Sequence, residues 1–347
     1  MRSLDSGFVG LALRGSRSIF TLGALFASVM LPAAFAQTYS TFDPPGAVNT
    51  YPTGINSLGD VAGTYTDSFG ASHGFLRTAN GTITTFDAPG SFETVPYGIN
   101  SSDEITGYAI ADFTYEYEGF LRTSDGTITI VDIPGGAGET YPYSINSSGD
   151  IAGFAVLTSG SGVGFILTSG GTLTIFDASN YRIFINDTDD VAGTILDRDI
   201  RDVGFVKPNG GSVTTFKVPL ELFTYVTGFN DSGTVAGYAS DQVCGPNSCV
   251  GSSTYEGLVR TSDGKITLFQ EAKEVATEAT AINASGEITG SYATSQDHGF
   301  SRDPSGVMTT IDPPGSTGTF PTSINDSGTI TGQFYMDGAY HGFILTP

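Results

Sequence analysis

The sequence predicts an all-β fold, a seven-bladed β-propeller of four-stranded antiparallel blades, and three observations carry this prediction. An apolar residue followed by asparagine recurs seven times, at intervals of 40 to 53 residues. A glycine stands seven residues after each asparagine, and a Gly-Phe or Gly-Leu pair follows it. The 47 glycines and 16 tyrosines favour short strands joined by tight turns. The repeated asparagines are Asn56, Asn100, Asn146, Asn186, Asn230, Asn283 and Asn325.

The first element along the chain is a predicted secretion signal over residues 1–36. Three arginines and an apolar stretch over residues 19–31 precede Ala34-Phe35-Ala36, which has the small residues of a cleavage site. We therefore expect a secreted protein, in the periplasm or outside the cell, with a single domain over residues 37–347. No later apolar run approaches the roughly 20 residues of a membrane-spanning helix, so no membrane span is expected.

Each repeat divides into four strand-like runs, and the first repeat illustrates them. Its runs are YPTGIN (51–56), DVAGTYTD (60–67), HGFLRT (73–78) and TITTFDAP (82–89). Glycine or aspartate stands in the turn between the first and second runs, and pairs such as Asn-Gly and Asp-Gly stand between the third and fourth. These residues tolerate positive φ and predict hairpins. A period in the forties with four strands is typical of a propeller blade.

The phase of the repeat predicts how the ring closes. The segment TYSTFDPPG (38–46) matches the fourth run of the other repeats, whereas the seventh repeat stops after its third run, HGFILTP. Pairing of the N-terminal strand with the last blade supplies the missing strand and removes an unpaired edge. Because each blade packs only against its neighbours, a chain of this length can form a single domain. We also expect a monomer.

The net charge argues against nucleic acid as a partner. The 36 acidic residues outnumber the 14 lysines and arginines, which gives a formal charge of −22. Removal of the predicted signal, with its three arginines and one aspartate, makes the charge more negative still. A field of this sign repels phosphate backbones and anionic lipid surfaces.

The repeated motifs resemble a known family. The motifs (H/E/V)-G-F, T-x-T-x-F-D, P-G and G-I-N-x-x-G-D-V-A-G are similar to the bacterial extracellular HAF repeat, over essentially all of residues 37–347. The chain differs from the family's His-Ala-Phe motif by having glycine in place of alanine, and histidine in three repeats only. The resemblance implies a secreted repeat protein and no particular activity.

The histidines are interpreted as structural. All three precede a Gly-Phe pair at the same position of their repeats, as His73, His298 and His341, and the other repeats have Glu118, Val163, Val203 and Glu256 there. Equivalent positions of different blades lie apart around a ring, so these side chains cannot share one metal ion or one reaction. We predict no metal site from them, and expect blade-edge side chains beside a close backbone contact.

Aspartates recur in two places. The turn Asn186–Asp190 (NDTDD) and its counterparts offer the oxygen ligands that calcium prefers, but lack the spacing of a calcium loop. Hydrogen bonds to their own backbone explain them, with bound calcium as the alternative and no other cofactor expected. The aspartate that ends the fourth run is interpreted as a turn-former before Pro-Gly; it is Asp43, Asp87, Asp132, Asp177 or Asp312, with Lys217 and Gln270 in the remaining repeats.

Three functions stay open at this point. A catalytic group must break the repeat, yet the irregular segments 111–119, 196–202 and 240–257 hold no nucleophile with a nearby base, histidine cluster or phosphate loop. We therefore favour a non-catalytic binding module for an extracellular glycan or protein. A carboxylate-based polysaccharide hydrolase or lyase is one alternative, since a propeller can bring carboxylates of distant blades together. A structural component of the cell surface or matrix is the other.

The predicted ligand-binding residues are tyrosines near the links between second and third runs: Tyr115, Tyr117, Tyr255, Tyr335 and Tyr340. These links vary most in length, and they emerge on the same face as the links between blades. Tyrosines on variable loops above a rigid scaffold offer contact area and a hydroxyl at low entropic cost. The alternative is that they pack the loops onto the strand ends.

The two cysteines predict a disulfide. Cys244 and Cys249 are separated by four residues in the longest insertion, in blade five. In an oxidising compartment a disulfide is favoured over zinc, which would need four ligands. Its expected role is to stiffen the insertion.

Overall fold

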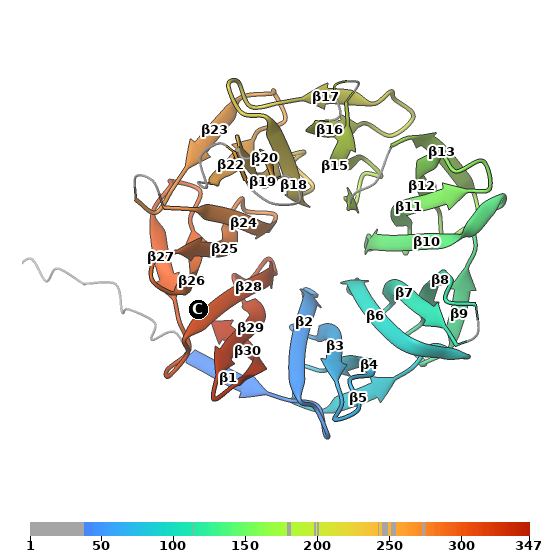
Figure 1. Cartoon of the computed structure of the whole chain (residues 1–347), viewed down its shortest axis with the longest axis horizontal. Coiled ribbons are helices and arrows are strands. Elements are labelled where there is room, and N and C mark those ends of the chain that lie inside the picture. The colour runs from blue at the N-terminus through green and yellow to red at the C-terminus, as the bar shows by residue number, and fades with distance from the viewer. Residues whose placement is uncertain are drawn as a thin grey trace, which may run out of the picture. The chain divides into compact units, whose positions relative to one another are not determined.

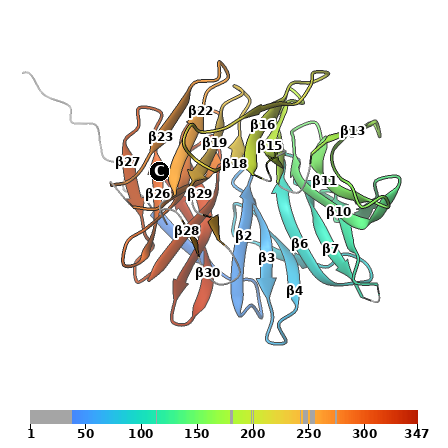
Figure 2. The same ribbon diagram turned by 45° about the horizontal axis from the view of Figure 1, so that its top comes forward.

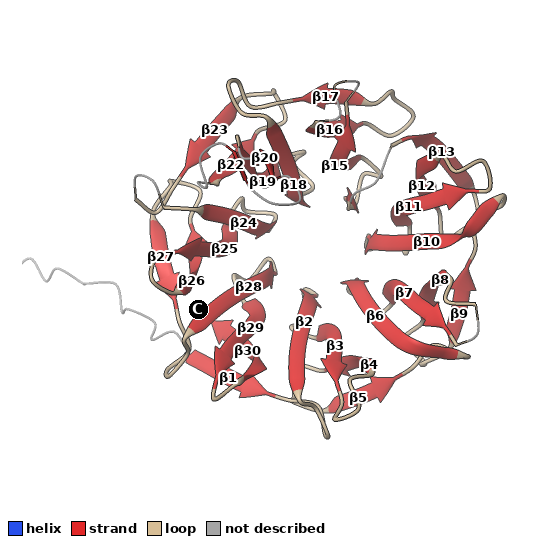
Figure 3. Cartoon of the chain, in the orientation of Figure 1, coloured by secondary structure: helices blue, strands red, loops and turns tan. Residues whose placement is uncertain are grey.

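The computed structural model describes residues 38–347 except 113, 179–181, 198, 200, 242, 245–248, 251–254 and 273–274, and only the backbone of 243–244 and 249–250. The described residues belong to one compact unit. Their secondary structure consists of thirty strands without a helix (Figure 3), as the all-β prediction requires. The described residues therefore contain no helix that could cross a membrane.

Within the described residues, 28 of the 30 strands fall into seven antiparallel sets of four, which we call blades and number along the chain (Figure 1). Blade 1 consists of β2 (Asn49–Ile55), β3 (Val61–Thr66), β4 (Ser72–Arg77) and β5 (Ile83–Phe86). These strands overlap the four predicted runs of the first repeat in order. In the tilted view, β2, β3 and β4 lie side by side (Figure 2).

The next five blades follow the same order. Blade 2 consists of β6 (Ser91–Ile99), β7 (Ile105–Ala111), β8 (Tyr117–Arg122) and β9 (Ile128–Val131). Blade 3 consists of β10 (Gly136–Ile145), β11 (Ile151–Leu157), β12 (Gly162–Leu167) and β13 (Leu173–Asp177). Blade 4 consists of β14 (Ile183–Ile185), β15 (Val191–Leu196), β16 (Asp202–Lys207) and β17 (Thr214–Phe216). Blade 5 consists of β18 (Phe223–Phe229), β19 (Val235–Ser240), β22 (Glu256–Arg260) and β23 (Ile266–Phe269). Blade 6 consists of β24 (Thr277–Ile282), β25 (Ile288–Ala293), β26 (Asp297–Arg302) and β27 (Met308–Ile311). The short pair β20 (Val243–Cys244) and β21 (Cys249–Val250) lies between β19 and β22.

The last blade joins the two ends of the described chain. Blade 7 consists of β28 (Gly318–Ile324), β29 (Ile330–Met336), β30 (Ala339–Thr346) and the opening strand β1 (Thr38–Phe42). Strand β1 is antiparallel to β30, with Thr38 opposite Thr346 and Phe42 opposite Gly342. The predicted pairing of the N-terminal strand with the last blade is therefore confirmed, and Figure 1 shows blue β1 beside red β30.

The turns between first and second strands have the backbone that their residues predict. All seven carry a residue with positive φ, and in two blades this residue is aspartate, with φ of 60° at Asp103 and 61° at Asp189. Aspartate is one of the few residues with a side chain that enters this region at low cost. The inner strands therefore turn back sharply, and every blade presents its first strand to the centre of the ring (Figure 1).

The Gly-Phe pair of each repeat builds the packing within and between blades. Phe75 is fully buried, as are its counterparts Phe120, Phe165, Phe205, Phe300 and Phe343. The glycine before it, Gly74, lies under the Phe86 ring, where an added Cβ would come within 2.6 Å of that ring. Apolar clusters then cross from blade to blade: Phe42 of blade 7 packs with Ile55 and Phe75 of blade 1.

Most basic side chains of the described residues serve the same junctions. Arg77 lies 5.0 Å above the ring of Phe42 in the preceding blade, and Arg122 lies 5.0 Å above Phe86. Lys207, Arg260 and Arg302 repeat the contact on Phe176, Phe216 and Phe269. These cation–π contacts add stability between blades and leave few cations for other roles.

Candidate binding site in the central channel

The repeated asparagines form a closed ring at one mouth of the channel. The Asn56 side-chain amide donates to the Asn100 carbonyl oxygen at 3.1 Å, and Asn325 donates to the Asn56 carbonyl oxygen at 3.0 Å. The five remaining anchors make the same bond to the next blade. The Asn56 side-chain oxygen accepts from the backbone of Leu58 and Asp60 in its own turn. Each asparagine thus closes a turn and joins two blades, so this mouth is a structural seam.

The aspartates beside this ring also bond to protein groups. In the NDTDD turn, Asp187 accepts a hydrogen bond from the Ser147 backbone of the preceding blade at 2.9 Å, and Asp190 accepts from the Asn209 backbone at 2.8 Å. Within the described residues no group of three acidic, histidine or cysteine side chains is arranged to hold a metal ion. The prediction that these turns bond their own backbone holds for Asn186, which accepts from Thr188 and Asp190. It is wrong for the two carboxylates, since Asp187 links two blades and Asp190 links its turn to the turn between β16 and β17 of blade 4.

The three histidines lie apart at the blade edges, and each has an aspartate partner. The Nδ1 atoms of His73, His298 and His341 lie 2.8, 2.7 and 2.8 Å from carboxylate oxygens of Asp87, Asp312 and Asp43. Burial lowers the pKa of His73, but hydrogen bonds and charge from Asp87 and Asp67 outweigh burial and raise it overall. The aspartates at the ends of the fourth runs, interpreted above as turn-formers, are therefore also histidine partners.

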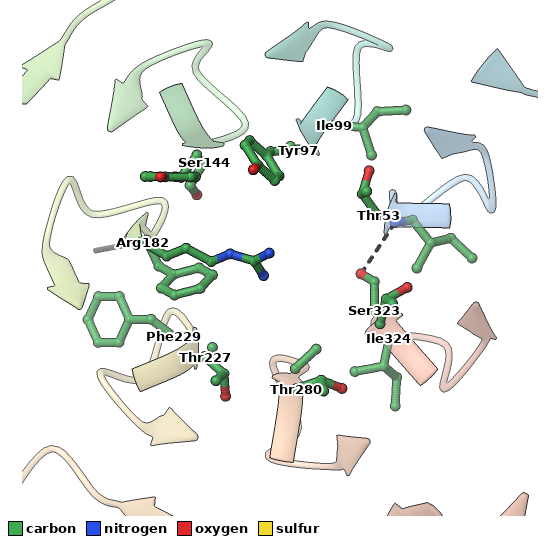
Figure 4. Close-up of a pocket in the computed structure, with 18 of the residues that line it drawn as sticks. Thr53, Tyr97, Ile99, Ser144, Arg182, Thr227, Phe229, Thr280, Ser323 and Ile324 are labelled. Atoms are coloured by element: carbon green, nitrogen blue, oxygen red, sulfur yellow. Dashed lines mark hydrogen bonds between the residues drawn. The ribbon is translucent and has the colours of Figure 1, made fainter. Parts of the chain in front are cut away.

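Beyond the asparagine ring, the channel encloses a cavity of about 310 Å³ lined by every inner strand (Figure 4). In blades 5, 6 and 7 the lining position three residues before the asparagine is threonine. Thr227, Thr280 and Thr322 each donate a 2.8 Å hydrogen bond to a backbone carbonyl of the next blade. On this side the channel wall is regular and its hydroxyl groups are used between blades.

The opposite side of the channel breaks this regularity. Blades 2 and 3 place Tyr97 and Tyr143 at the threonine position, with ring centroids 5.0 Å apart. Blade 4 contributes Arg182, whose exposed guanidinium lies 5.3 Å above the Tyr97 ring. Figure 4 shows Arg182 extending toward the middle of the channel, with Tyr97 and Ser144 on one side and Thr227 on the other. The cavity therefore has one cationic, aromatic wall.

The aromatic wall continues outward as a cluster of half-buried tyrosines, which we call the tyrosine cluster: Tyr97, Tyr108, Tyr117, Tyr141 and Tyr143. Neighbouring rings lie 5.0 to 6.2 Å apart. Burial and the charge of Glu139 raise the pKa of Tyr141, and burial and Tyr97 raise the pKa of Tyr143 to about 12 against the opposing charge of Arg182. The phenols of Tyr141 and Tyr143 are therefore neutral at ordinary pH and present both rings and hydroxyl groups.

A second aromatic group lies on blade 5. Tyr238 packs against Tyr225 at 4.8 Å and against Tyr255 at 5.6 Å. Burial, followed by the charge of Glu278, raises the pKa of Tyr238, and the positive charge of Arg182 opposes the rise. Arg182 thus acts electrostatically on tyrosines of blades 2, 3 and 5.

The structure distributes the five predicted tyrosines over three places. Tyr117 belongs to the tyrosine cluster and Tyr255 packs on Tyr238. Tyr115 is 69% exposed and contacts Phe92. Tyr335 and Tyr340 contact each other at 5.1 Å, and Tyr340 also contacts Tyr51, on the far side of the ring at blades 7 and 1. Of the five, Tyr117 therefore extends the aromatic group that includes the channel wall, Tyr255 belongs to the second aromatic group on blade 5, and the others lie elsewhere.

The sequence interpretation missed Tyr97, Tyr143 and Arg182, which carry the cationic wall. The signal for Tyr97 and Tyr143 was the inner-strand position three residues before the asparagine, where four repeats have threonine: Thr53, Thr227, Thr280 and Thr322. In blade 4 that position is Ile183, and Arg182 precedes it. The backbone of β20 and β21 places Cys244 opposite Cys249. Their side chains are outside the described part, so the disulfide stays a prediction.

Comparisons with known proteins identify the fold. No protein-family model matches this chain, and no curated protein matches its sequence significantly. Virginiamycin B lyase from Staphylococcus aureus, in selenomethionine form, superposes with a TM-score of 0.60 and 17% identity over 90% of this chain and 99% of that chain. The β-propeller domain of the Trilobed protease from Pyrococcus furiosus superposes with a TM-score of 0.63 and 8% identity over 85% and 95%. The BP39L lectin from Burkholderia pseudomallei gives 0.50 and 10% over 87% and 99%. At these identities the likeness shows the β-propeller fold alone.

Proposed function

We propose that this chain is a secreted seven-bladed β-propeller that binds an extracellular glycan, without catalysis, at the channel wall formed by blades 2 to 5. The observation that carries the proposal is the break in symmetry at the inner strands. Residues that recur in every blade hold the ring together, whereas Tyr97 and Tyr143 stand where four blades have threonine, and Arg182 extends from blade 4 into the channel. Binding accounts for that replacement.

A glycan fits the chemistry of this wall. Half-buried tyrosines offer apolar ring faces that stack on the C–H face of a sugar, and neutral hydroxyl groups that bond its hydroxyls. The regular side adds the hydroxyl groups of threonines and of Ser323, and Ser144 adds one beside the tyrosines. The volume of about 310 Å³ lies at the lower end of small-molecule sites, which suits one or two sugar residues better than a folded partner.

The same residues offer little for catalysis. The histidines are paired with aspartates at the blade edges, away from the channel lining. The similar solved structures include lyases, a protease domain and a lectin, so the fold is compatible with enzymes and binding proteins alike. The chemistry of the channel lining therefore supports the proposal of recognition over catalysis.

The test is a glycan array probed with labelled protein of residues 37–347. We expect selective binding by the parent and at least a tenfold loss in Tyr97→Thr/Tyr143→Thr, which carries the residue that other blades accept at this position. Phe69→Ser removes a 93% exposed aromatic from the blade 1 turn and is the control, expected to bind as the parent does. Absence of array binding by the parent, or undiminished binding by the folded double threonine variant, would refute the proposal.

One carboxyl group makes the enzymatic alternative testable. Burial, followed by the charge of Asp297, raises the pKa of Glu278, which lies half-buried on the inner strand of blade 6 and acts on Tyr238. A raised carboxyl pKa is what a general acid requires. Incubation of the parent with neutral and acidic polysaccharides should release no reducing ends or unsaturated products. Release that is abolished in Glu278→Gln would show a hydrolase or lyase instead.

A further inference from the structure

We infer that Arg182 is a carboxylate subsite, so that the glycan bound in the channel is one with an acidic sugar, a uronic acid. The inference rests on the proposed binding function and specifies its ligand. It starts from the charge of the lining. Among the described residues that line the cavity, Arg182 alone is charged, and the remainder are apolar, hydroxylic or glycine.

The second step is that Arg182 lacks an internal partner. Among the described residues, Arg182 has no carboxylate within salt-bridge distance, and its guanidinium is not a donor in any hydrogen bond. The chain carries 36 acidic residues, so a carboxylate beside Arg182 would be easy to supply. The other cation–π side chains are used differently: Arg77 and Arg122 also donate to backbone carbonyls at the blade junctions. Within the described part of the chain, Tyr97 is thus the contact that holds the guanidinium of Arg182, which faces the cavity.

The third step concerns the kind of anion. A guanidinium is planar and binds a carboxylate through two parallel N–H donors, a geometry that also adds specificity. The formal charge of −22 repels ligands with dense negative charge at long range. One cation inside an acidic protein therefore suits one carboxylate, and it disfavours heavily sulfated chains or nucleic acid.

The fourth step places the sugar ring. The guanidinium lies 5.3 Å from the centroid of Tyr97, and Tyr143 lies 5.0 Å further along the wall. A ring stacked on Tyr143 would present a carboxylate to the guanidinium and its hydroxyl groups to Ser144 and Thr227, which Figure 4 shows around Arg182. Charge and shape then select the same ligand, a uronic acid residue.

The experiment compares trisaccharides of galacturonate, glucuronate and mannuronate with their methyl esters by calorimetric titration. The ester keeps the ring and removes only the charge. We expect the parent to bind at least one acid tenfold or more tightly than its ester. Arg182→Gln should abolish this preference with ester binding unchanged, and Arg182→Lys should retain part of it. Lys265→Gln, which removes an exposed cation from the blade 5 hairpin, should match the parent.

The outcomes separate this inference from the proposed function. If the parent binds acid and ester equally, and Tyr97→Thr/Tyr143→Thr binds neither, the binding site stands and the carboxylate subsite is wrong. A preference for the acid that persists in Arg182→Gln, or that is lost equally in Lys265→Gln, also overturns the subsite. If the parent binds no acid and no ester, the inference fails, and a positive glycan array with neutral sugars would still support the binding function.

Discussion

Strand β1 is the only part of blade 7 that comes from the other end of the described chain, so its attachment can be tested by one substitution, Phe42→Ala. Phe42 is 9% exposed and packs with Ile55, Phe75 and Ile344 across blades 7 and 1. Truncation of a buried phenylalanine costs about 3 to 5 kcal/mol, and loss of the Arg77 contact above its ring adds about 1 kcal/mol. We therefore expect the free energy of unfolding to fall by about 5 kcal/mol.

The matched control is Phe86→Ala, at the equivalent position of blade 1. Phe86 lies beneath Arg122 at 5.0 Å and contacts Phe120, so its truncation removes comparable interactions. Strand β5, however, is joined to its pairing partner β4 by a hairpin, whereas β1 and its partner β30 come from opposite ends of the described chain and no turn joins them. Each backbone bond of that ladder contributes about 1 kcal/mol, so β1 can open locally once Phe42 is lost.

Denaturant unfolding and amide hydrogen exchange measure the two effects. Both variants should lower the unfolding midpoint, but only Phe42→Ala should accelerate exchange of residues 38–42 well beyond the change in global stability. If β1 in Phe42→Ala and β5 in Phe86→Ala are equally protected from hydrogen exchange, the closing strand does not open independently of the rest of its blade, and the reasoning is wrong.

Three further predictions follow from the same contacts. Asn146→Ala removes bonds to Asn186, Asp189 and two backbone amides, and calorimetry should show a loss of about 3 kcal/mol; a loss below about 1 kcal/mol would contradict the seam. Burial lowers the pKa of His73, but Asp87 and Asp67 raise it by more, so the pKa is higher in the folded protein than in the unfolded chain. The resulting stabilisation is therefore present below the unfolded pKa of about 6.5 and is lost as pH rises through the raised folded pKa. The melting temperature of His73→Gln should therefore fall below that of the parent by more at about pH 5 than at about pH 8.5; an equal deficit at both would exclude the ionic contribution. Finally, thiol titration should find Cys244 and Cys249 disulfide-bonded, and reduction should cost about 2 kcal/mol, whereas two free thiols would exclude the bridge.

The architecture was predictable because its causes are local. Positive φ at Asp103 and Asp189 follows from the residue type, and the same turn recurs in every repeat. The pairing of β1 with β30 follows from the phase of a repeat that begins with a fourth strand. Neither conclusion needed a side chain to be placed against a distant one.

The aspartate partners of the histidines were harder to predict, because hairpins and the ring closure bring together residues that are distant in sequence. His73 and Asp87 are 14 residues apart in sequence, but His341 and Asp43 are 298 residues apart. The relevant clue was joint occurrence, because each histidine repeat also has an aspartate at the end of its fourth run. Considered separately, the two positions indicated an edge residue and a turn-former.

The channel wall shows that the repeats have to be compared at the positions that line the channel, and not only in their links. Insertions such as residues 240–257 are conspicuous breaks in the repeat, but they lie in links, whereas a substitution at a lining position changes the cavity without altering the length of any blade. Replacement of threonine by Tyr97 and Tyr143 also gives up the interblade hydroxyl bonds that Thr227 and Thr280 make. These bonds stabilise the ring, so their absence on one side has a structural cost that a purely structural role does not explain. The proposed ligand, in contact with the rings and Arg182, would supply a compensating interaction, and the least regular inner positions are therefore the ones to test for function.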